Sequence, residues 1–307
     1  GLCDLDTYNS FEKGEDIEDI HVVRLLLQRL GISASLAGRY LCRDEYDEMH
    51  ARFNILELLR ADKLILAKKA AQQYKNCYCA KSRLNKQFMA YMSARIAQLD
   101  GDTVGALCLY KKAIGYTIED YGVAEFTCIS VYEYFMLANI ARLNAVLGNY
   151  MEAEKLYERL LAYCHRRNSD RWTMACVYPK TVCEMLDINS PDSMGIYERR
   201  VWLEECNAAI KALCDTARLH YICPLLGKRH ALLELLGEAP DRQWDDFLEH
   251  YEWLRNKYHI KGELLEWYPY YNSDWEFYPV EKLINERRKL YGMTIEVLAE
   301  GVCAPET

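Results

Sequence analysis

The sequence is short of glycine and proline, with 15 and 7 of them among 307 residues. These residues interrupt helices, and here they lie mostly between apolar stretches with helical spacing. Little β structure is therefore expected. No apolar run approaches the roughly 18 residues of a membrane-spanning helix, and the first residues lack the basic-then-apolar pattern of a secretory signal. We expect a soluble, cytoplasmic protein without membrane contact.

Positive charge is scarcer than negative charge. The chain carries 38 Lys and Arg against 46 Asp and Glu, which gives a net charge of −8 at pH 7. Because affinity for phosphates depends on Lys and Arg, the bulk of the chain is not expected to be a nucleic-acid surface. Any DNA contact must come from a small local element.

Motifs of enzyme sites are also missing. The sequence has no Gly-rich phosphate loop, no His-Glu-x-x-His metal motif and no Gly-x-Ser-x-Gly elbow. Cys77 and Cys79 have the wrong spacing for a zinc knuckle, and no second Cys or His pair is placed to complete a four-ligand zinc site with them. We therefore expect no catalytic residue, no metal site and no cofactor, and the protein is not expected to be an enzyme.

Cysteine is plentiful, but the pattern does not indicate a secreted disulfide scaffold. The 13 cysteines are an odd number in a long chain. Most lie inside apolar helical runs, and they are predicted to be reduced and buried: Cys108, Cys128, Cys176, Cys183 and Cys206.

The clearest positive signal is a helical hairpin over residues 126–165. Apolar residues upstream keep a helical spacing up to Leu147, and Gly148-Asn149 then breaks the chain. The period restarts with Tyr150, Ala153, Tyr157 and Leu160. A small residue at the turn, followed by an aromatic residue, Ala and a second aromatic residue, resembles a tetratricopeptide repeat.

One such hairpin cannot bury its own apolar face, so the resemblance implies neighbouring hairpins. Gly101-Asp102, Ala106, Tyr110 and Ala113 stand in the same relative positions as the residues of the first hairpin. The anchors are 39, 47, 49 and 45 residues apart, longer than the repeat's roughly 34, and are Ala67, Ala106, Ala153, Trp202 and Phe247. We expect an all-α, tetratricopeptide-like superhelix of about five helical hairpins over residues 42–262. The alternative is a non-repetitive helical bundle.

Turn signals give the expected helical segments of this array. They are 45–60, 62–75, 84–116 as a pair, 126–165 as a pair, 170–187, 196–219, 221–236 and 240–258. The clearest loop is 189–193, which contains Pro191.

The N-terminal segment, residues 1–41, resembles the later part of a repressor-like helix-turn-helix domain of the xenobiotic-response-element family. In that family the recognition helix runs into a Glu-x-Gly turn, which here reads Glu12-Lys13-Gly14. The resemblance implies DNA contacts at Thr7 and Asn9. The alternative is a plain capping segment for the helical array.

Residues 263–279 form an aromatic-rich linker. Trp267 to Pro279 holds seven aromatic residues and two prolines in thirteen positions, so no helix is expected there. The segment is interpreted as a plug over the end of the array, since terminal repeats need capping. A strip that binds a partner is the alternative.

The C-terminal segment, residues 280–307, resembles the first two helices of the same helix-turn-helix domain. The spacing is carried by Leu283, Ile284, Met293, Leu298 and Ala299. The resemblance implies DNA contacts at Arg287 and at Thr294, which begins the second helix.

The two ends of the chain resemble each other. Residues 301–307 and 1–7 share Gly, Cys and Thr at equivalent places. We therefore expect a fragment of a longer protein with a helix-turn-helix domain on each side of the array. In a second interpretation, the C-terminal half-domain completes the N-terminal one in the same chain or in another copy.

A ligand site is expected on the first helix of each hairpin, which lines the groove in the repeat that this sequence resembles. Arg95 and Arg142 hold equivalent positions, with Tyr91 and Asn139 on nearby turns. Two guanidinium groups along a groove can hold a carboxylate or the backbone carbonyls of an extended peptide. Alternatively, they pair with acidic residues of neighbouring helices.

The combination of a repressor-like helix-turn-helix with tetratricopeptide-like hairpins resembles the peptide-sensing regulators of the Rgg, PlcR, NprR and PrgX kind. The resemblance implies the sensory and oligomerisation region of a DNA-binding transcriptional regulator. Its partners would be a peptide or protein ligand in the groove and DNA through the completed helix-turn-helix, and a homodimer is compatible with it. The alternative function is a protein–protein interaction scaffold without DNA binding.

Overall fold

The computed structural model of the chain describes residues 6, 22, 40–41, 43–80, 82–122, 126, 129–166, 171–216, 221–239, 242–257, 278–279 and 289. In these ranges it has ten bounded α-helices, a short 3-10 turn and one pair of two-residue strands. The all-α class is therefore confirmed.

The helices lie where the turn signals place them. They are α3 (Arg43–Arg60), α4 (Leu64–Tyr78), α5 (Arg83–Leu99), α6 (Thr103–Ile114), α7 (Val131–Val146), α8 (Tyr150–Arg166), α9 (Arg171–Ile188), α10 (Ile196–Cys214), α11 (Ile222–Leu236) and α12 (Arg242–Lys257). The expected loop at 189–193 contains the 3-10 turn η2 (Pro191–Ser193). The largest deviations are α10, which ends before the expected residue 219, and α7, which begins after residue 126.

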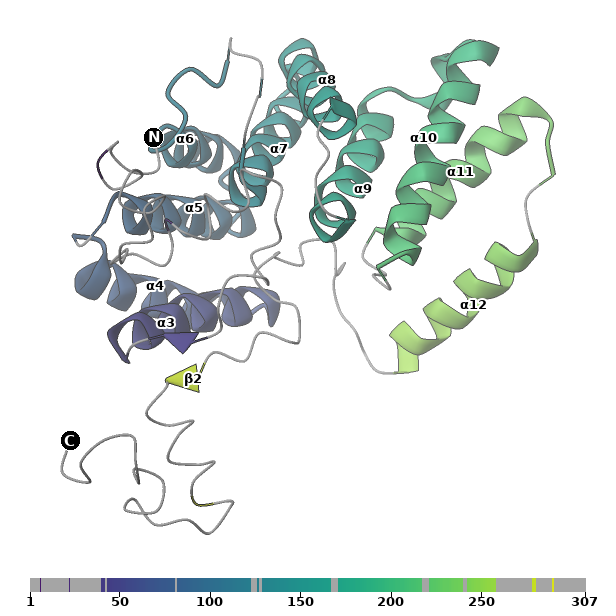
Figure 1. Cartoon of the computed structure of the whole chain (residues 1–307). Helices are drawn as coiled ribbons and strands as arrows, with labels where there is room; N and C mark the ends of the chain where they lie inside the picture. Colours follow the sequence, from purple (N-terminus) through teal and green to yellow (C-terminus); the bar gives the residue numbers. More distant parts are fainter. Residues whose placement is uncertain are drawn as a thin grey trace.

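Successive helices from α3 to α11 pack against one another in chain order, as Figure 1 shows. In addition, α7 packs on α9, and α9 on α11. Most of the connections are short, whereas the one between α6 and α7 spans residues 115–130. The helices α3, α5, α7, α9 and α11 begin the successive pairs and are called the first helices below. Their partners α4, α6, α8 and α10 are called the second helices.

Glycine permits the tight turns inside two of these pairs. Gly101 and Gly148 have positive φ angles of 84° and 83°. An L side chain rarely adopts this conformation, whereas glycine does so without a steric penalty. The following helix α6 begins at once, because the Asp102 side chain accepts a hydrogen bond from the Gly105 N–H across 2.8 Å.

The core lies between the paired helices and has the expected small and aromatic residues. Those of the second helices are fully buried and include Ala67, Ala106, Tyr110, Ala113, Ala153, Tyr157 and Leu160. The expectation for cysteine needs one correction. Cys176, Cys183 and Cys206 are buried, but Cys108 is exposed on α6. Cys128 lies outside the described residues.

Two short strands join distant parts of the chain. Tyr40–Leu41 (β1) pairs in parallel with Tyr278–Pro279 (β2), and both strands contact α3. The rest of the aromatic linker at 263–277 lies outside the described residues, as do the two expected helix-turn-helix segments apart from a few isolated positions. The expected DNA contacts Thr7, Asn9, Arg287 and Thr294 are among the residues not described.

Candidate functional site

The candidate site begins with two polar residues on one face of α7. Arg142 follows Asn139 by three positions, and its Nη2 donates a hydrogen bond to Asn139 Oδ1 across 3.1 Å. Asn139 is only 1% exposed. Its Nδ2 has no hydrogen-bond partner in the described part of the chain. A buried amide donor without a partner costs about 1–3 kcal/mol, which makes this position a candidate for contact with a ligand.

Arg95 on α5 reaches the same neighbourhood through a tyrosine of α6. Burial raises the pKa of Tyr110, while Arg95 and Arg142 both act to lower it, Arg95 also through a hydrogen bond. The Tyr110 hydroxyl donates to Gln98 Oε1 across 3.0 Å. Both guanidinium groups therefore lie within electrostatic reach of the Tyr110 hydroxyl. That they line a ligand groove stays a prediction.

Tyr91, the fourth residue expected in the groove, belongs to the hydrophobic core cluster. It is only 1% exposed. Its ring packs on Tyr110 with centroids 5.7 Å apart and on Tyr132 with centroids 5.3 Å apart. The Tyr91 ring is therefore packed between helices, and its contact with a ligand stays a prediction.

A third basic residue, which the sequence analysis missed, comes from α9. Lys180 is fully buried, and its Nζ donates to Glu184 Oε1 across 2.7 Å and to the Tyr221 hydroxyl across 3.2 Å. Tyr157 completes the arrangement, since its hydroxyl donates to Glu184 Oε2 across 2.8 Å. The available signal was a Lys and a Glu four residues apart in an otherwise apolar helix.

Lys180 is electrostatically linked to the two arginines. Burial is the largest cause that lowers its pKa, and Arg142 and Arg95 lower it further, whereas Glu184 raises it. We use the name basic cluster for Arg95, Arg142 and Lys180, together with the amide of Asn139. Its charged groups come from α5, α7 and α9, three successive first helices. Such an arrangement suits an anionic group that accepts several charge-assisted hydrogen bonds.

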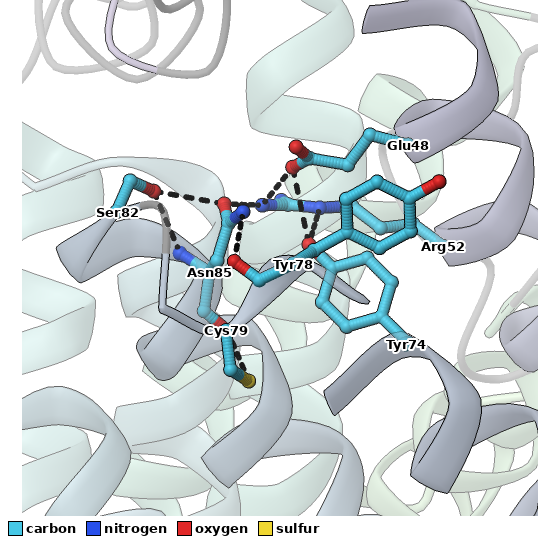
Figure 2. A network of polar contacts seen from close by, with 7 residues as sticks. All are labelled: Glu48, Arg52, Tyr74, Tyr78, Cys79, Ser82 and Asn85. Atoms are coloured by element: carbon cyan, nitrogen blue, oxygen red, sulfur yellow. Dashed lines mark hydrogen bonds and ion pairs between the residues drawn. The ribbon is translucent and has the colours of Figure 1, made fainter. Parts of the chain in front are cut away.

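A second polar network joins the first hairpin to α5, and Figure 2 shows it at close range. Arg52 of α3 is buried, and its Nε donates to the Tyr74 hydroxyl and its Nη2 to Asn85 Oδ1, each across 2.7 Å. Nη2 also donates to Glu48 Oε1 across 3.3 Å. The guanidinium carbon lies 4.6 Å from the centroid of the Phe88 ring. The acceptors of these Arg52 hydrogen bonds are all groups of the protein itself. We call these residues the Arg52 network and assign it a structural role.

Other kinds of site do not emerge from the described residues. Among them, no group of three or more His, Cys, Asp or Glu side chains is arranged to hold a metal ion. In the same part of the chain, no helix has the length and apolar character needed to cross a membrane.

Comparisons with family models, with curated proteins and with solved structures find no match to this chain.

Proposed function

We propose that helices α3 to α12 form a tetratricopeptide-like array whose first helices bind a short peptide or an extended protein segment at the basic cluster. The observation that carries the proposal is the buried Asn139 Nδ2, a hydrogen-bond donor without a partner in the described chain, beside Arg142. The repeated alanine and tyrosine positions of the second helices support the array.

The chemistry of the cluster suits a peptide. An extended peptide carries backbone carbonyls that no internal structure satisfies, and the Asn139 amide can donate to one of them. A carboxylate of the same peptide, from its C-terminus or from an acidic side chain, would accept hydrogen bonds from Arg95 or Arg142. Lys180 adds positive charge from α9 while it stays paired with Glu184.

We propose further that this array is the sensory and oligomerisation region of a DNA-binding transcriptional regulator. The support is the helix-turn-helix resemblance of residues 1–41 and 280–307. The pairing of β1 with β2 on α3 also places residue 41, the end of the first segment, beside residue 279, after which the second segment begins. A ligand that binds one conformation of the array more tightly than another would shift both attachment points together.

The test is a selection experiment in two steps. A pool of short synthetic peptides is first selected on the immobilised full chain, and random duplex DNA is then selected with and without the enriched peptides. Peptide-dependent DNA enrichment is the expected result. Peptide binding with no DNA enrichment in either condition supports the interaction scaffold instead. If neither pool is enriched, both functions are wrong.

A further inference from the structure

Positive charge is concentrated in one part of this acidic chain. The 37 residues from 63 to 99 contain no Asp or Glu. Residues 63–118 hold ten Lys and Arg against two acidic residues, Asp100 and Asp102, so this stretch carries a charge of +8. The remaining residues carry −16, since the whole chain carries −8. Such an asymmetry within one chain indicates a local surface for an anionic partner.

The basic stretch forms helices α4, α5 and α6, which pack side by side, as Figure 1 shows. Five exposed basic residues lie where α4 ends, where α5 begins and where α6 ends. They are Lys75 of α4, Arg83 and Lys86 of α5, and Lys111 and Lys112 of α6. We call these five residues the basic end.

Contacts between α4 and α5 hold the first part of the basic end together. At the start of α5, Asn85 Nδ2 donates to the Tyr78 carbonyl at the end of α4 across 3.0 Å. Burial raises the pKa of the Cys79 thiol, which follows α4, and Lys75 and Lys86 both act to lower it. The lysines of the two helices therefore lie around the same thiol.

Contacts between α5 and α6 hold the second part together. Gln87 Nε2 of α5 donates to Thr117 Oγ1, just after α6, across 2.8 Å. One turn earlier on α5, Arg83 Nη2 lies 3.8 Å from Glu119 Oε1. The start of α5 thus lies beside the end of α6, whose last turn carries the two remaining lysines. The basic end is one surface region of three neighbouring helices.

Helix stability explains only part of this arrangement. Lysines in the last turns of α4 and α6 complement the negative ends of those helix dipoles. Arg83 and Lys86 lie instead in the first turn of α5, at the positive end of its dipole, where a basic side chain is unfavourable. The Glu119 partner of Arg83 has an 81% exposed side chain, and such an exposed pair adds little stability. The excess of positive charge therefore points to a partner outside the chain.

We propose that the basic end binds the phosphate backbone of duplex DNA, at a site separate from the expected helix-turn-helix contacts. Each exposed Lys or Arg can neutralise a phosphate and release its counterion, and such contacts carry no sequence information. Proteins that bind single strands add aromatic side chains on which bases stack. Among the described residues of α4 to α6, the large hydrophobic side chains that are exposed are all aliphatic: Ile65, Leu66, Leu99 and Val104.

The same four aliphatic residues argue against a membrane as the partner. They lie at the start of α4, the end of α5 and the start of α6, away from the basic end. Their end of the helices also carries acidic groups, since Lys68 lies 2.6 Å from the Asp100 carboxylate. A membrane-binding surface instead combines basic and apolar residues in one place.

The test is the salt dependence of DNA binding by the full chain without peptide. Fluorescence anisotropy follows a labelled duplex of arbitrary sequence as salt rises from about 50 to 200 mM. Five phosphate contacts predict a slope of about −4 to −5 for the logarithm of the association constant against the logarithm of salt concentration. In a triple variant, Lys86→Gln with Lys111→Gln and Lys112→Gln, the slope should become shallower by about 3. Affinity at the lowest salt should fall by about tenfold or more.

The matched control is Lys155→Gln with Lys211→Gln and Lys257→Gln. It removes the same charge from exposed lysines of α8, α10 and α12, and its slope is expected to equal that of the unmodified chain. Both triple variants keep residues 1–41 and 280–307, so a failure of the helix-turn-helix proposal leaves this comparison unchanged. If the first triple variant unfolds, Lys75→Gln with Arg83→Gln repeats the test.

Three results would overturn the proposal. The first is an unmodified chain that does not bind the duplex at the lowest salt, including one that binds anionic vesicles or polyglutamate instead. The second is an equal slope in the two folded triple variants. The third is tighter binding to a single strand of the same length than to the duplex.

Discussion

Arg142 and Asn139 are joined on one face of α7, where Arg142 Nη2 donates to Asn139 Oδ1 across 3.1 Å. The bond fixes the orientation of the buried amide and leaves its Nδ2 without a partner in the described chain. By contrast, the Arg52 guanidinium donates to Tyr74, Asn85 and Glu48, all of them protein groups. This difference leads us to propose that the Asn139 amide contacts a ligand and that Arg52 stabilises the fold.

Replacement of Arg52 tests the structural role of its network. Arg52→Met removes the ion pair with the buried Glu48 and the hydrogen bonds to Tyr74 and Asn85, and we expect the free energy of unfolding to fall by about 3–5 kcal/mol. The measurement is urea unfolding at pH 7. Arg60→Met is the control, because its ion pair with Glu57 is exposed and such pairs contribute about 0–1 kcal/mol. Equal losses in the two variants would remove the structural assignment.

The Lys180–Glu184 pair gives a second stability prediction. In Lys180→Met the nearly buried Glu184 loses the ammonium group 2.7 Å away, and we expect a loss of about 3 kcal/mol. Replacing both residues, Lys180→Met with Glu184→Leu, removes the unpaired charge and should cost less than the sum of the two single changes. Urea unfolding of the four proteins measures the coupling. Additive effects would show that the two charges do not interact.

The turn glycines give a third prediction. Gly148→Ala places a side chain at a φ of +83°, and we expect a loss of about 1 kcal/mol in the free energy of unfolding. Gly195→Ala is the matched control, since Gly195 also has open space around its added Cβ but an ordinary negative φ. Thermal unfolding of both variants is the measurement. A Gly148→Ala variant as stable as the control contradicts the turn geometry.

Buried thiols predict a loss of stability at alkaline pH. Burial raises the pKa of Cys164, Cys183 and Cys206 from 9.0 to about 12 in each case. Above pH 9 the thiols ionise in the unfolded chain, whereas the folded chain keeps them protonated. Ionisation therefore lowers the free energy of the unfolded state but not that of the folded state. We therefore expect the free energy of unfolding to fall as pH rises from 9 toward 12.

Urea unfolding at pH 8, 9 and 10 checks this dependence. A Cys183→Ala and Cys206→Ala double variant should show a weaker fall with pH, because it lacks two of the three groups. A Cys108→Ala variant is the control, since Cys108 is exposed. Stability that stays constant or increases over this range would contradict the burial of the three thiols.

Much of the helical array follows from local sequence signals. Gly148 and Gly101 mark turns because few other residues adopt positive φ, and the alternation of Ala106 with Tyr110 marks a face that packs closely. Cys108 shows where periodicity fails. The apolar residues of α6 surround much of the helix, so spacing alone does not decide which of them faces water.

The candidate site was less predictable, because its members are brought together by contacts between distant segments. Arg95 and Arg142 could be found from equivalent positions in two hairpins. For Lys180 the sequence offered only the spacing to Glu184, four residues later. Its other partner, Tyr221, lies just before α11, and no local pattern signals that contact. Tyr91 lies one helical turn before Arg95, yet the neighbouring rings of Tyr110 and Tyr132 bury it.

The most direct test of the central claim is a binding titration of peptides enriched on the full chain, followed by fluorescence anisotropy. It compares the unmodified protein, an Arg95→Ala and Arg142→Ala double variant, and an Arg60→Ala and Arg200→Ala control whose side chains are more than half exposed. Loss of charge-assisted hydrogen bonds should weaken binding by more than about tenfold in the first variant and leave the control unchanged. Unchanged affinity in a folded Arg95→Ala and Arg142→Ala protein would contradict a ligand site at the basic cluster.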